Sequence, residues 1–265
     1  MLWALARPFR VLAKSRKLPK GRALAARVAH RVAWGTIQAG TPIAARTPAG
    51  CRVVFGSETL IARALWTFGA FEQEELSAAG RLAKLGTCAI DVGANVGLFT
   101  VELSRAVGPE GLVIALEPVT STAEQLQSNL DRNRCANIDV VVGAAGPVAG
   151  RIELFLSDDP ALHSAGQKPI AGRAILGSII VPAYTLDDLW AAAGRPRVGF
   201  VKIDVEGGEL GVLLGATRMI SACRPHMIVE VPDRERLDEI LAILPGYRLA
   251  SVRGFEPWNH LLVPQ

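Results

Sequence analysis

The sequence has few of the residues that build disulfide-stabilised or zinc-stabilised folds. Its 265 residues include four cysteines, Cys51, Cys88, Cys135 and Cys223, which lie far apart, with no C-x-x-C pair and no histidine at ligand spacing. A disulfide framework or structural zinc site is therefore not expected, and a reducing compartment, the cytoplasm, fits best. Hydrophobic residues make up 50% of the chain, which is enough for a full-sized core.

Acidic residues are missing from the N-terminal segment. Eleven Lys or Arg residues precede Glu58, the first acidic residue. The formal net charge of the whole chain is +4, so the residues from Glu58 onward have a net charge of −7. The segment has no apolar run of about 18 residues that could span a bilayer, and Arg7 and Arg10 interrupt its only apolar stretch, which argues against a signal peptide. We expect residues 1–57 to be a basic leader, helical or partly disordered. It either covers part of the domain or touches an anionic membrane from the cytoplasmic side, and a transit peptide is a third alternative.

From Thr87 onward, short apolar runs alternate with helical patterns. This alternation is typical of βαβ units and predicts that residues 58–265 form a doubly wound, Rossmann-like α/β domain with a mostly parallel sheet. The expected strands are 88–93, 112–117, 138–144, 198–205, 226–231, 247–252 and 260–264. The last two are joined too closely for a crossover helix, so we expect them to pair antiparallel at one edge.

The connections carry helix signals and one insertion. Residues 58–85 read as helical, Ser121 with Glu124 predicts a capping box, and Thr185 with Asp188 predicts another. Gly194 suits the position just after the helix that Thr185 begins. Residues 150–182 break the βαβ pattern and are expected to form an extra strand pair or a lid.

The stretch AIDVGANVGLFTVELS, residues 89–104, reads as a buried strand, a glycine-rich turn and an amphipathic helix. In an open α/β sheet, nucleotide-like ligands bind beyond the carboxyl ends of the strands, where Gly93 and Gly97 would let the backbone approach them. The dinucleotide fingerprint needs glycine at positions that Asn95 and Leu98 occupy, so a pyrophosphate cradle is disfavoured.

Two carboxylates favour S-adenosylmethionine as the ligand of this turn. Asp91 lies beside the glycines and suits a sulfonium cation better than a pyrophosphate. Glu117 ends the second strand, where its two oxygens could accept hydrogen bonds from both ribose hydroxyls. The plainer interpretation of Asp91 is a turn or helix-capping residue.

A second cluster lies in FVKIDVEGGELGVLLGA, residues 200–216. Lys202, Asp204, Glu206 and Glu209 crowd the end of an apolar strand, which indicates a functional site because buried like charges are costly without a ligand or counter-ion. The plainer interpretation pairs Lys202 with a neighbouring carboxylate and places Glu209 at a helix N-terminus.

Taken together, these motifs resemble the FkbM-type methyltransferases over about residues 69–264. The resemblance rests on FEQEEL (71–76), DVGANVGLFT (91–100), ALEPVTSTAEQLQSNL (115–130), TLDDL (185–189), KIDVEGGEL (202–210) and the closing WNHLLVP. It implies a class I methyltransferase fold with an antiparallel last strand, and S-adenosylmethionine-dependent methylation of a hydroxyl on a sugar, glycolipid, polyketide or similar metabolite. The acceptor is then a small or lipid-linked molecule.

The resemblance also assigns roles to residues. The positions that would line the methionine end of the cofactor are Asp91, Gly93, Asn95 and Gly97, whereas Glu117 would hold the ribose and Ala144 or Ala145 would lie near the adenine. Asp204 would face the sulfonium and the acceptor. The long basic leader and Gly208 depart from the usual pattern, and Gly208 puts the helix start at Glu209 in doubt.

Methyl transfer to a neutral hydroxyl requires in-line geometry and a proton acceptor. Asp204 and Glu206 are the first candidates for this base, and His163 in the insertion is the next. Asp204 and Glu230 end neighbouring strands and could share a Mg²⁺ ion, but two carboxylates make an incomplete site, so we expect no metal.

Three other functions stay open at this stage. A nucleotide-dependent oxidoreductase is disfavoured by Asn95. A nucleic-acid methyltransferase is disfavoured because the body has no N-P-P-Y type motif and no basic stripe interleaved with aromatics. A non-catalytic membrane-binding module would depend on the leader alone.

Overall fold

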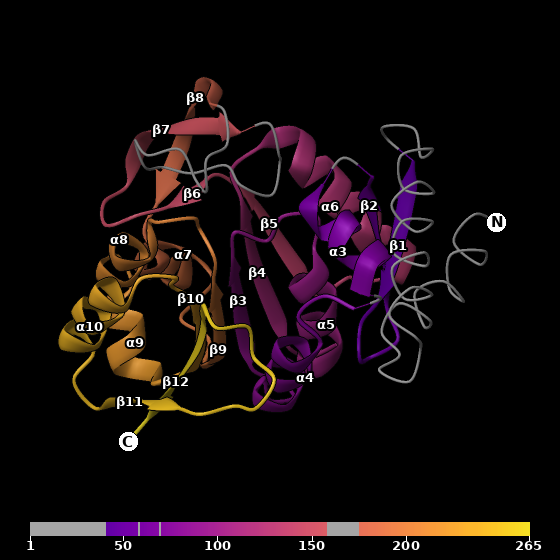
Figure 1. Cartoon of the computed structure of the whole chain (residues 1–265). Coiled ribbons are helices and arrows are strands. Elements are labelled where there is room, and N and C mark those ends of the chain that lie inside the picture. Colours follow the sequence, from indigo (N-terminus) through magenta and orange to yellow (C-terminus); the bar gives the residue numbers. More distant parts are fainter. Residues whose placement is uncertain (1–40, 58, 69, 158–174) are drawn as a thin grey trace, which may run out of the picture. The chain divides into compact units, whose positions relative to one another are not determined.

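A computed structural model describes residues 41–57, 59–68, 70–157 and 175–265. They belong to two units, one comprising the chain up to Ala45 with Val54–Phe71, the other Arg46–Val53 with Glu72–Gln265. The second unit contains a seven-stranded sheet in the order β11-β12-β10-β9-β3-β4-β5 (Figure 1). Its strands are β3 (Cys88–Val92), β4 (Leu112–Glu117), β5 (Ile138–Val142), β9 (Val198–Ile203), β10 (His226–Glu230), β11 (Tyr247–Ala250) and β12 (Asn259–Pro264).

The sheet is mostly parallel. Strands β10, β9, β3, β4 and β5 pair parallel with one another in that order, whereas β12 pairs antiparallel with both β10 and β11. This confirms the Rossmann-like class and the antiparallel pairing of the last two strands. Strand β12 lies one place in from the edge, because β11 takes the edge position.

Helices cover both faces of this sheet. The helices of the second unit are α4 (Gln73–Leu82), α5 (Leu98–Val107), α6 (Thr120–Asn133), α7 (Leu186–Ala192), α8 (Glu209–Leu214), α9 (Thr217–Cys223) and α10 (Arg234–Ile243). Alternate strand residues such as Ile90, Val201 and Ile203 share a hydrophobic core with α7, α8, α9 and α10. Helices α4, α5 and α6 contact the strands from the other face, so β3 is buried along its whole length.

The insertion between β5 and β9 contains further strands. Strand β7 (Gly150–Ser157) pairs antiparallel with β8 (Ile175–Tyr184), and β8 also pairs parallel with the short β6 (Ala144–Ala145). The strand pair expected here is therefore present as a separate three-stranded sheet. Residues 158–174 between β7 and β8 lie outside the described residues.

One expectation for the N-terminal part needs correction and another is confirmed. Strands β1 (Pro42–Arg46) and β2 (Arg52–Gly56) form a two-stranded sheet within the segment that was expected to be helical or disordered. A turn between them with Gly50 at φ 82° joins two short runs of alternating burial, which suit strands better than a helix. Residues 58–85 contain two helices, α3 (Leu60–Phe68) and α4, which confirms the helical pattern predicted there, and Glu72 adopts a left-handed backbone just before α4. Residues 1–40 of the leader lie outside the described part of the chain.

One of the predicted capping boxes is wrong and the other is half right. Helix α6 begins at Thr120 with Val119 at the N-cap and no side-chain cap, so Ser121 and Glu124 make no capping box. Thr185 does cap α7, because its Oγ1 accepts a 3.0 Å hydrogen bond from the Asp188 backbone amide. Gly194 follows the end of α7 at φ 82°, as predicted.

Candidate active site

The glycine-rich turn after β3 packs tightly against other parts of the chain. Gly93 has φ 80°, and a Cβ at this position would lie 1.8 Å from the backbone oxygen of Asp204. Gly97 has φ 92°, and its Cβ would lie 2.4 Å from Cδ1 of Leu126 in α6. Both glycines have the positive φ that favours glycine, and at Gly93 the close approach is to backbone, so no side-chain movement could relieve it. In particular, Gly93 brings the turn after β3 into contact with the residue that follows β9.

Asp91 lies in the penultimate position of β3 and is buried. Its Oδ2 accepts a 2.6 Å hydrogen bond from Oγ1 of Thr100, which belongs to the first turn of α5. Burial raises the pKa of Asp91 to about 6, and this hydrogen bond opposes the rise. Asp91 thus contacts the first turn of α5 through a side chain and is not its cap, because α5 has no side-chain cap, and contact with a cofactor stays a prediction.

Glu117 is the last residue of β4 and accepts a hydrogen bond from the same turn. Its Oε2 accepts from the amide of Asn95 and its Oε1 from the amide of Val119, both at 3.0 Å. Burial raises the pKa of this carboxyl to about 7. Because each carboxylate oxygen has two lone pairs, both oxygens keep one for a further donor such as a ribose hydroxyl.

The remaining predicted cofactor residues lie in this turn and in β6. Asn95 has a left-handed backbone with φ 51°, which asparagine tolerates, and its Oδ1 accepts a 2.7 Å bond from the Val96 amide. Ala144 and Ala145 form β6 just after β5 and are half-buried. The structure therefore brings Asp91, Gly93, Asn95 and Glu117 together at the carboxyl ends of β3 and β4.

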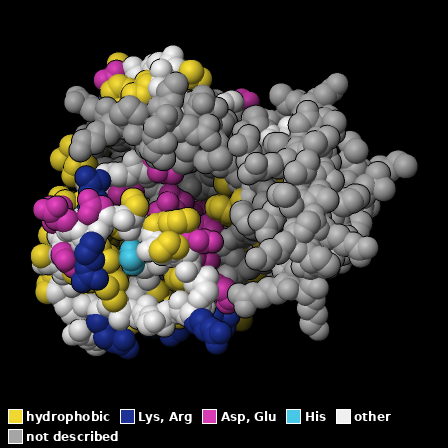
Figure 2. Space-filling view, viewed as in Figure 1, with side chains coloured by type: hydrophobic (Ala, Val, Ile, Leu, Met, Phe, Trp, Pro, Cys, Tyr) yellow, Lys and Arg dark blue, Asp and Glu magenta, His cyan; other side chains and the backbone are white. Residues whose placement is uncertain are grey.

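Asp204 directly follows β9, and its amide donates a 3.0 Å hydrogen bond to the Val92 oxygen of β3. One oxygen each of Asp204, Glu206 and Glu230 lies within 4.8 Å of the others, and we call these three residues the carboxylate cluster. Burial and the neighbouring Asp204 raise the pKa of Glu230 to about 9. Figure 2 shows acidic side chains gathered in the middle of the face it presents.

Sequence reasoning placed Asp204 and Glu206 together correctly but considered Glu230 only as a metal ligand. Glu230 ends β10, which pairs parallel with β9, and this position could have indicated that it lies near Asp204 and Glu206. His163 lies outside the described residues, so its predicted role has no structural counterpart here.

Lys202 forms the ion pair, and Glu209 takes the place at a helix N-terminus, that the plainer interpretation of this cluster predicted. Lys202 pairs with Asp204, since its Nζ lies 3.4 Å from Oδ2 of that carboxylate. Helix α8 does begin at Glu209, whose Oε1 accepts a 2.8 Å hydrogen bond from the amide of Gly207. The other oxygen of Glu209 is buried without a hydrogen-bond partner.

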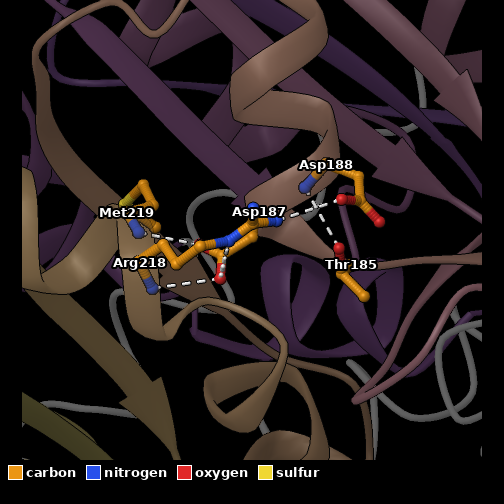
Figure 3. Close-up of polar contacts among 5 residues, drawn as sticks. All are labelled: Thr185, Asp187, Asp188, Arg218 and Met219. Atoms are coloured by element: carbon orange, nitrogen blue, oxygen red, sulfur yellow. Dashed lines mark hydrogen bonds and ion pairs between the residues drawn. The ribbon is translucent and has the colours of Figure 1, made fainter.

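The TLDDL motif connects helix α7 to helix α9. Asp187 is buried, and its two oxygens accept hydrogen bonds from the amides of Met219 at 2.7 Å and Arg218 at 3.0 Å (Figure 3). These amides belong to the first turn of α9, which has no side-chain cap of its own. Asp187 therefore caps α9 from α7, while Asp188 makes an exposed ion pair with Arg218.

Comparison with known proteins decides the family. Residues 91–256, which hold the glycine turn, Glu117 and the carboxylate cluster, match the Methyltransferase FkbM domain. The chain belongs to the FkbM methyltransferase family. It is thus an S-adenosylmethionine-dependent methyltransferase, and the oxidoreductase alternative is not supported.

Two characterised proteins are similar in sequence to this chain. The 31-O-demethyl-FK506 methyltransferase FkbM of Streptomyces tacrolimicus is 28% identical over 203 residues, which span 65% of this chain and 76% of that protein. The hexuronic acid methyltransferase AglP of Haloferax volcanii is 28% identical over 166 residues, or 61% of this chain and 62% of that protein.

Among solved structures, a methyltransferase FkbM from Methylobacillus flagellatus KT is similar at 21% identity with a TM-score of 0.47. The match covers 75% of this chain and 51% of that one.

Proposed function

We propose that this FkbM family member transfers the methyl group of S-adenosylmethionine to a hydroxyl oxygen of a sugar, glycolipid, polyketide or similar metabolite. Supporting this, one similar protein is named for methylation at an oxygen of FK506 and another for methylation of a hexuronic acid. The observation that carries the proposal is the contact between the Gly93 turn and Asp204. It places the carboxylate cluster beside the turn proposed to hold the donor.

In the proposed complex, Asp91, Gly93, Asn95 and Gly97 line the methionine end of the donor. Glu117 accepts hydrogen bonds from the ribose through the lone pairs that its two amide partners leave free. Ala144 or Ala145, after β5, lies near the adenine.

The acceptor is proposed to lie over the carboxylate cluster. Transfer needs the acceptor oxygen about 3 Å from the methyl carbon and opposite the sulfur, so the main contribution of the site is orientation. Asp204 is proposed to take the hydroxyl proton as the methyl–oxygen bond forms and the methyl–sulfur bond breaks, with Glu206 as the second candidate. General-base assistance of this kind contributes about 10²-fold to 10⁴-fold.

We propose that the reaction needs no metal. The three carboxylates of the cluster could ligate a divalent cation, which makes Mg²⁺ the competing candidate. However, the ammonium of Lys202 already lies 3.4 Å from Asp204 and supplies part of the positive charge that a cation would bring.

Calorimetry with S-adenosylhomocysteine tests the donor site, and a methyl-donor assay tests the acceptor. Tritiated S-adenosylmethionine is incubated with fractionated cell glycolipids and small metabolites, and mass spectrometry locates the added methyl group. We expect micromolar binding that Glu117→Gln weakens by at least tenfold, and label on a hydroxyl. Absence of binding to well-folded protein, or label only on nitrogen or carbon, would contradict the proposal.

A nucleic-acid acceptor is the competing hypothesis. Retention of RNA by the chain that is sensitive to salt and persists without residues 1–57 would favour it.

The basic leader is proposed to attach the enzyme peripherally to the inner face of the membrane, next to lipid-linked acceptors. No helix among the described residues is long and apolar enough to cross a bilayer. Sedimentation with anionic liposomes, compared between the full chain and a chain lacking residues 1–40, tests the attachment. Equal sedimentation of the two chains would argue against it.

A further inference from the structure

Lys202 is the one Lys or Arg side chain among the buried residues in the described part of the chain. It lies in β9, in register with Asp91 of β3 and Ile228 of β10. Its strand neighbours point into the core beneath α7 to α10, so Lys202 points to the opposite face, where α4 and α5 lie. A fully buried lysine is rare unless its charge has partners.

The ammonium of Lys202 has three partners from separate elements. Its Nζ lies 3.4 Å from Oδ2 of Asp204, 3.5 Å from Oδ1 of Asn259 in β12, and 5.2 Å from the ring centroid of Phe99 in α5. The last contact is a cation–π interaction. These contacts hold the charged end from several directions.

Asn259 extends the contacts to the segment that leads into α4. Its Nδ2 donates a 2.7 Å hydrogen bond to Glu72 and a longer one, at 3.4 Å, to Glu75. Asn259 thus accepts from the lysine with its oxygen and donates to the carboxylates with its nitrogen. Because the amide group uses both ends, its orientation is fixed.

Four carboxyl groups are close enough to stabilise the positive charge of Lys202. They are Glu72 before α4, Asp91 in β3, Asp204 after β9 and Glu230 in β10. Burial raises the pKa of Glu72 to about 7, and the ammonium opposes this rise for Glu72, Asp91 and Glu230. In turn, these carboxylates raise the pKa of Lys202, which keeps it charged despite its burial.

We propose that Lys202 is a positioning residue of the methyl transfer: its buried ammonium fixes the Asp204 carboxylate against the Gly93 turn without touching donor or acceptor. The inference rests on the proposed function, in which Asp204 takes the acceptor proton. The Asp204 side chain is 28% exposed, so the lysine is what restrains it on the protein side. A displacement of about 1 Å in such a group can cost about 10²-fold in rate.

The test compares Lys202→Met with Lys84→Met, a matched loss of an exposed lysine. Turnover is measured as tritium transfer into the glycolipid or metabolite fraction that the wild type labels. We expect Lys202→Met to lower kcat by about 10²-fold, to leave the Kd for S-adenosylhomocysteine within about threefold, and to move the rising limb of the pH–rate profile to higher pH. Lys202→Arg should recover part of kcat, and Lys84→Met should match the wild type.

A titration that needs no acceptor supports the same test. In protein with ¹³C-labelled glutamate carboxyls, removal of the ammonium should raise the pKa values of Glu72 and Glu230, because the nearby positive charge favours their ionised forms. Unchanged pKa values in folded Lys202→Met would overturn the inference, as would an unchanged kcat.

The double variant Lys202→Met/Asp204→Asn removes both charges of the ion pair and leaves one fewer uncompensated carboxylate than Lys202→Met alone. If the lysine acts through Asp204, the double variant should turn over within threefold of Asp204→Asn alone. A double variant at least tenfold slower than Asp204→Asn would overturn the inference. If Asp204→Asn itself retains wild-type turnover while the donor still binds, the proposed base is wrong, which is a different failure.

Discussion

Replacing Gly93 by alanine should separate the cost of a left-handed backbone from the cost of the contact between β3 and β9. Gly93 and Gly86 both have positive φ, at 80° and 72°. A Cβ at Gly86 would meet nothing within 4 Å, whereas one at Gly93 would lie 1.8 Å from the Asp204 oxygen. Gly86→Ala is therefore a matched control for Gly93→Ala.

The expected magnitudes follow from these two environments. Both variants place alanine in the left-handed region, which costs about 1 to 2 kcal/mol of folding free energy. Ordinary van der Waals contact begins at 3.4 Å, so the turn at Gly93 and the backbone of Asp204 must also separate by about 1.6 Å. Overpacking of this kind adds about 1 to 3 kcal/mol, so Gly93→Ala should lose about 2 to 5 kcal/mol.

Separation of the two strand ends should also reduce catalysis. A shift of about 1 Å between donor turn and base is expected to lower kcat by about 10²-fold, while Gly86→Ala keeps wild-type turnover. Urea unfolding measures the stability loss, and tritium transfer from S-adenosylmethionine measures the rate. Equal stability of the two alanine variants, or a Gly93→Ala enzyme with full kcat, would refute the argument from the contact.

Three further predictions concern the cap that Asp187 provides for α9, the Glu117 carboxyl group and the metal. Asp187→Ala should destabilise the fold by about 2 kcal/mol, mainly because two amides of α9 lose their acceptor. Both Asp187 and Asp188 also pair with the exposed Arg218, so Asp188→Ala, which should cost less than about 1 kcal/mol in thermal unfolding, measures the size of such an ion pair without the cap. The pKa of Glu117 is raised in the folded protein to about 7, so the cofactor-free protein should lose stability as pH rises from about 4.5 to about 7. In urea unfolding at pH 5 and pH 8, Glu117→Gln should reduce that loss by about 2.5 kcal/mol, and a variant with the same pH dependence as the wild type would contradict this. Chelation by EDTA should leave turnover unchanged, and activity lost in EDTA and restored by Mg²⁺ would make the carboxylate cluster a metal site.

The central sheet and the donor turn were readable from the sequence because their signals are local. The run from Cys88 to Val92 is buried on both faces, which gives an uninterrupted apolar segment apart from Asp91. The glycines that follow mark a backbone conformation that few other residues adopt. By contrast, the start of α6 was missed because Val119 occupies the N-cap without any capping side chain.

The surroundings of Lys202 could not be predicted, because its partners are remote in sequence. Asn259 and Glu72 are 187 positions apart, and no periodicity links a residue of the closing strand to one before α4. Glu230 was visible as a strand end, but its distance to Asp204 and Glu206 depends on the order of strands β9 and β10. Sequence patterns predict the elements, and only their arrangement shows which charges meet.

The bond between Asn259 and Glu72 has a consequence for how this enzyme matures on the ribosome. Strand β12 inserts between β10 and β11, which are both synthesised before it, so a nascent chain that still lacks β12 has a gap in its sheet. During that interval Lys202 lacks Asn259, and Glu72 lacks its amide donor. The hydrogen bonds around Lys202 can therefore be completed only after β12 has been synthesised and has entered the sheet between its two older neighbours.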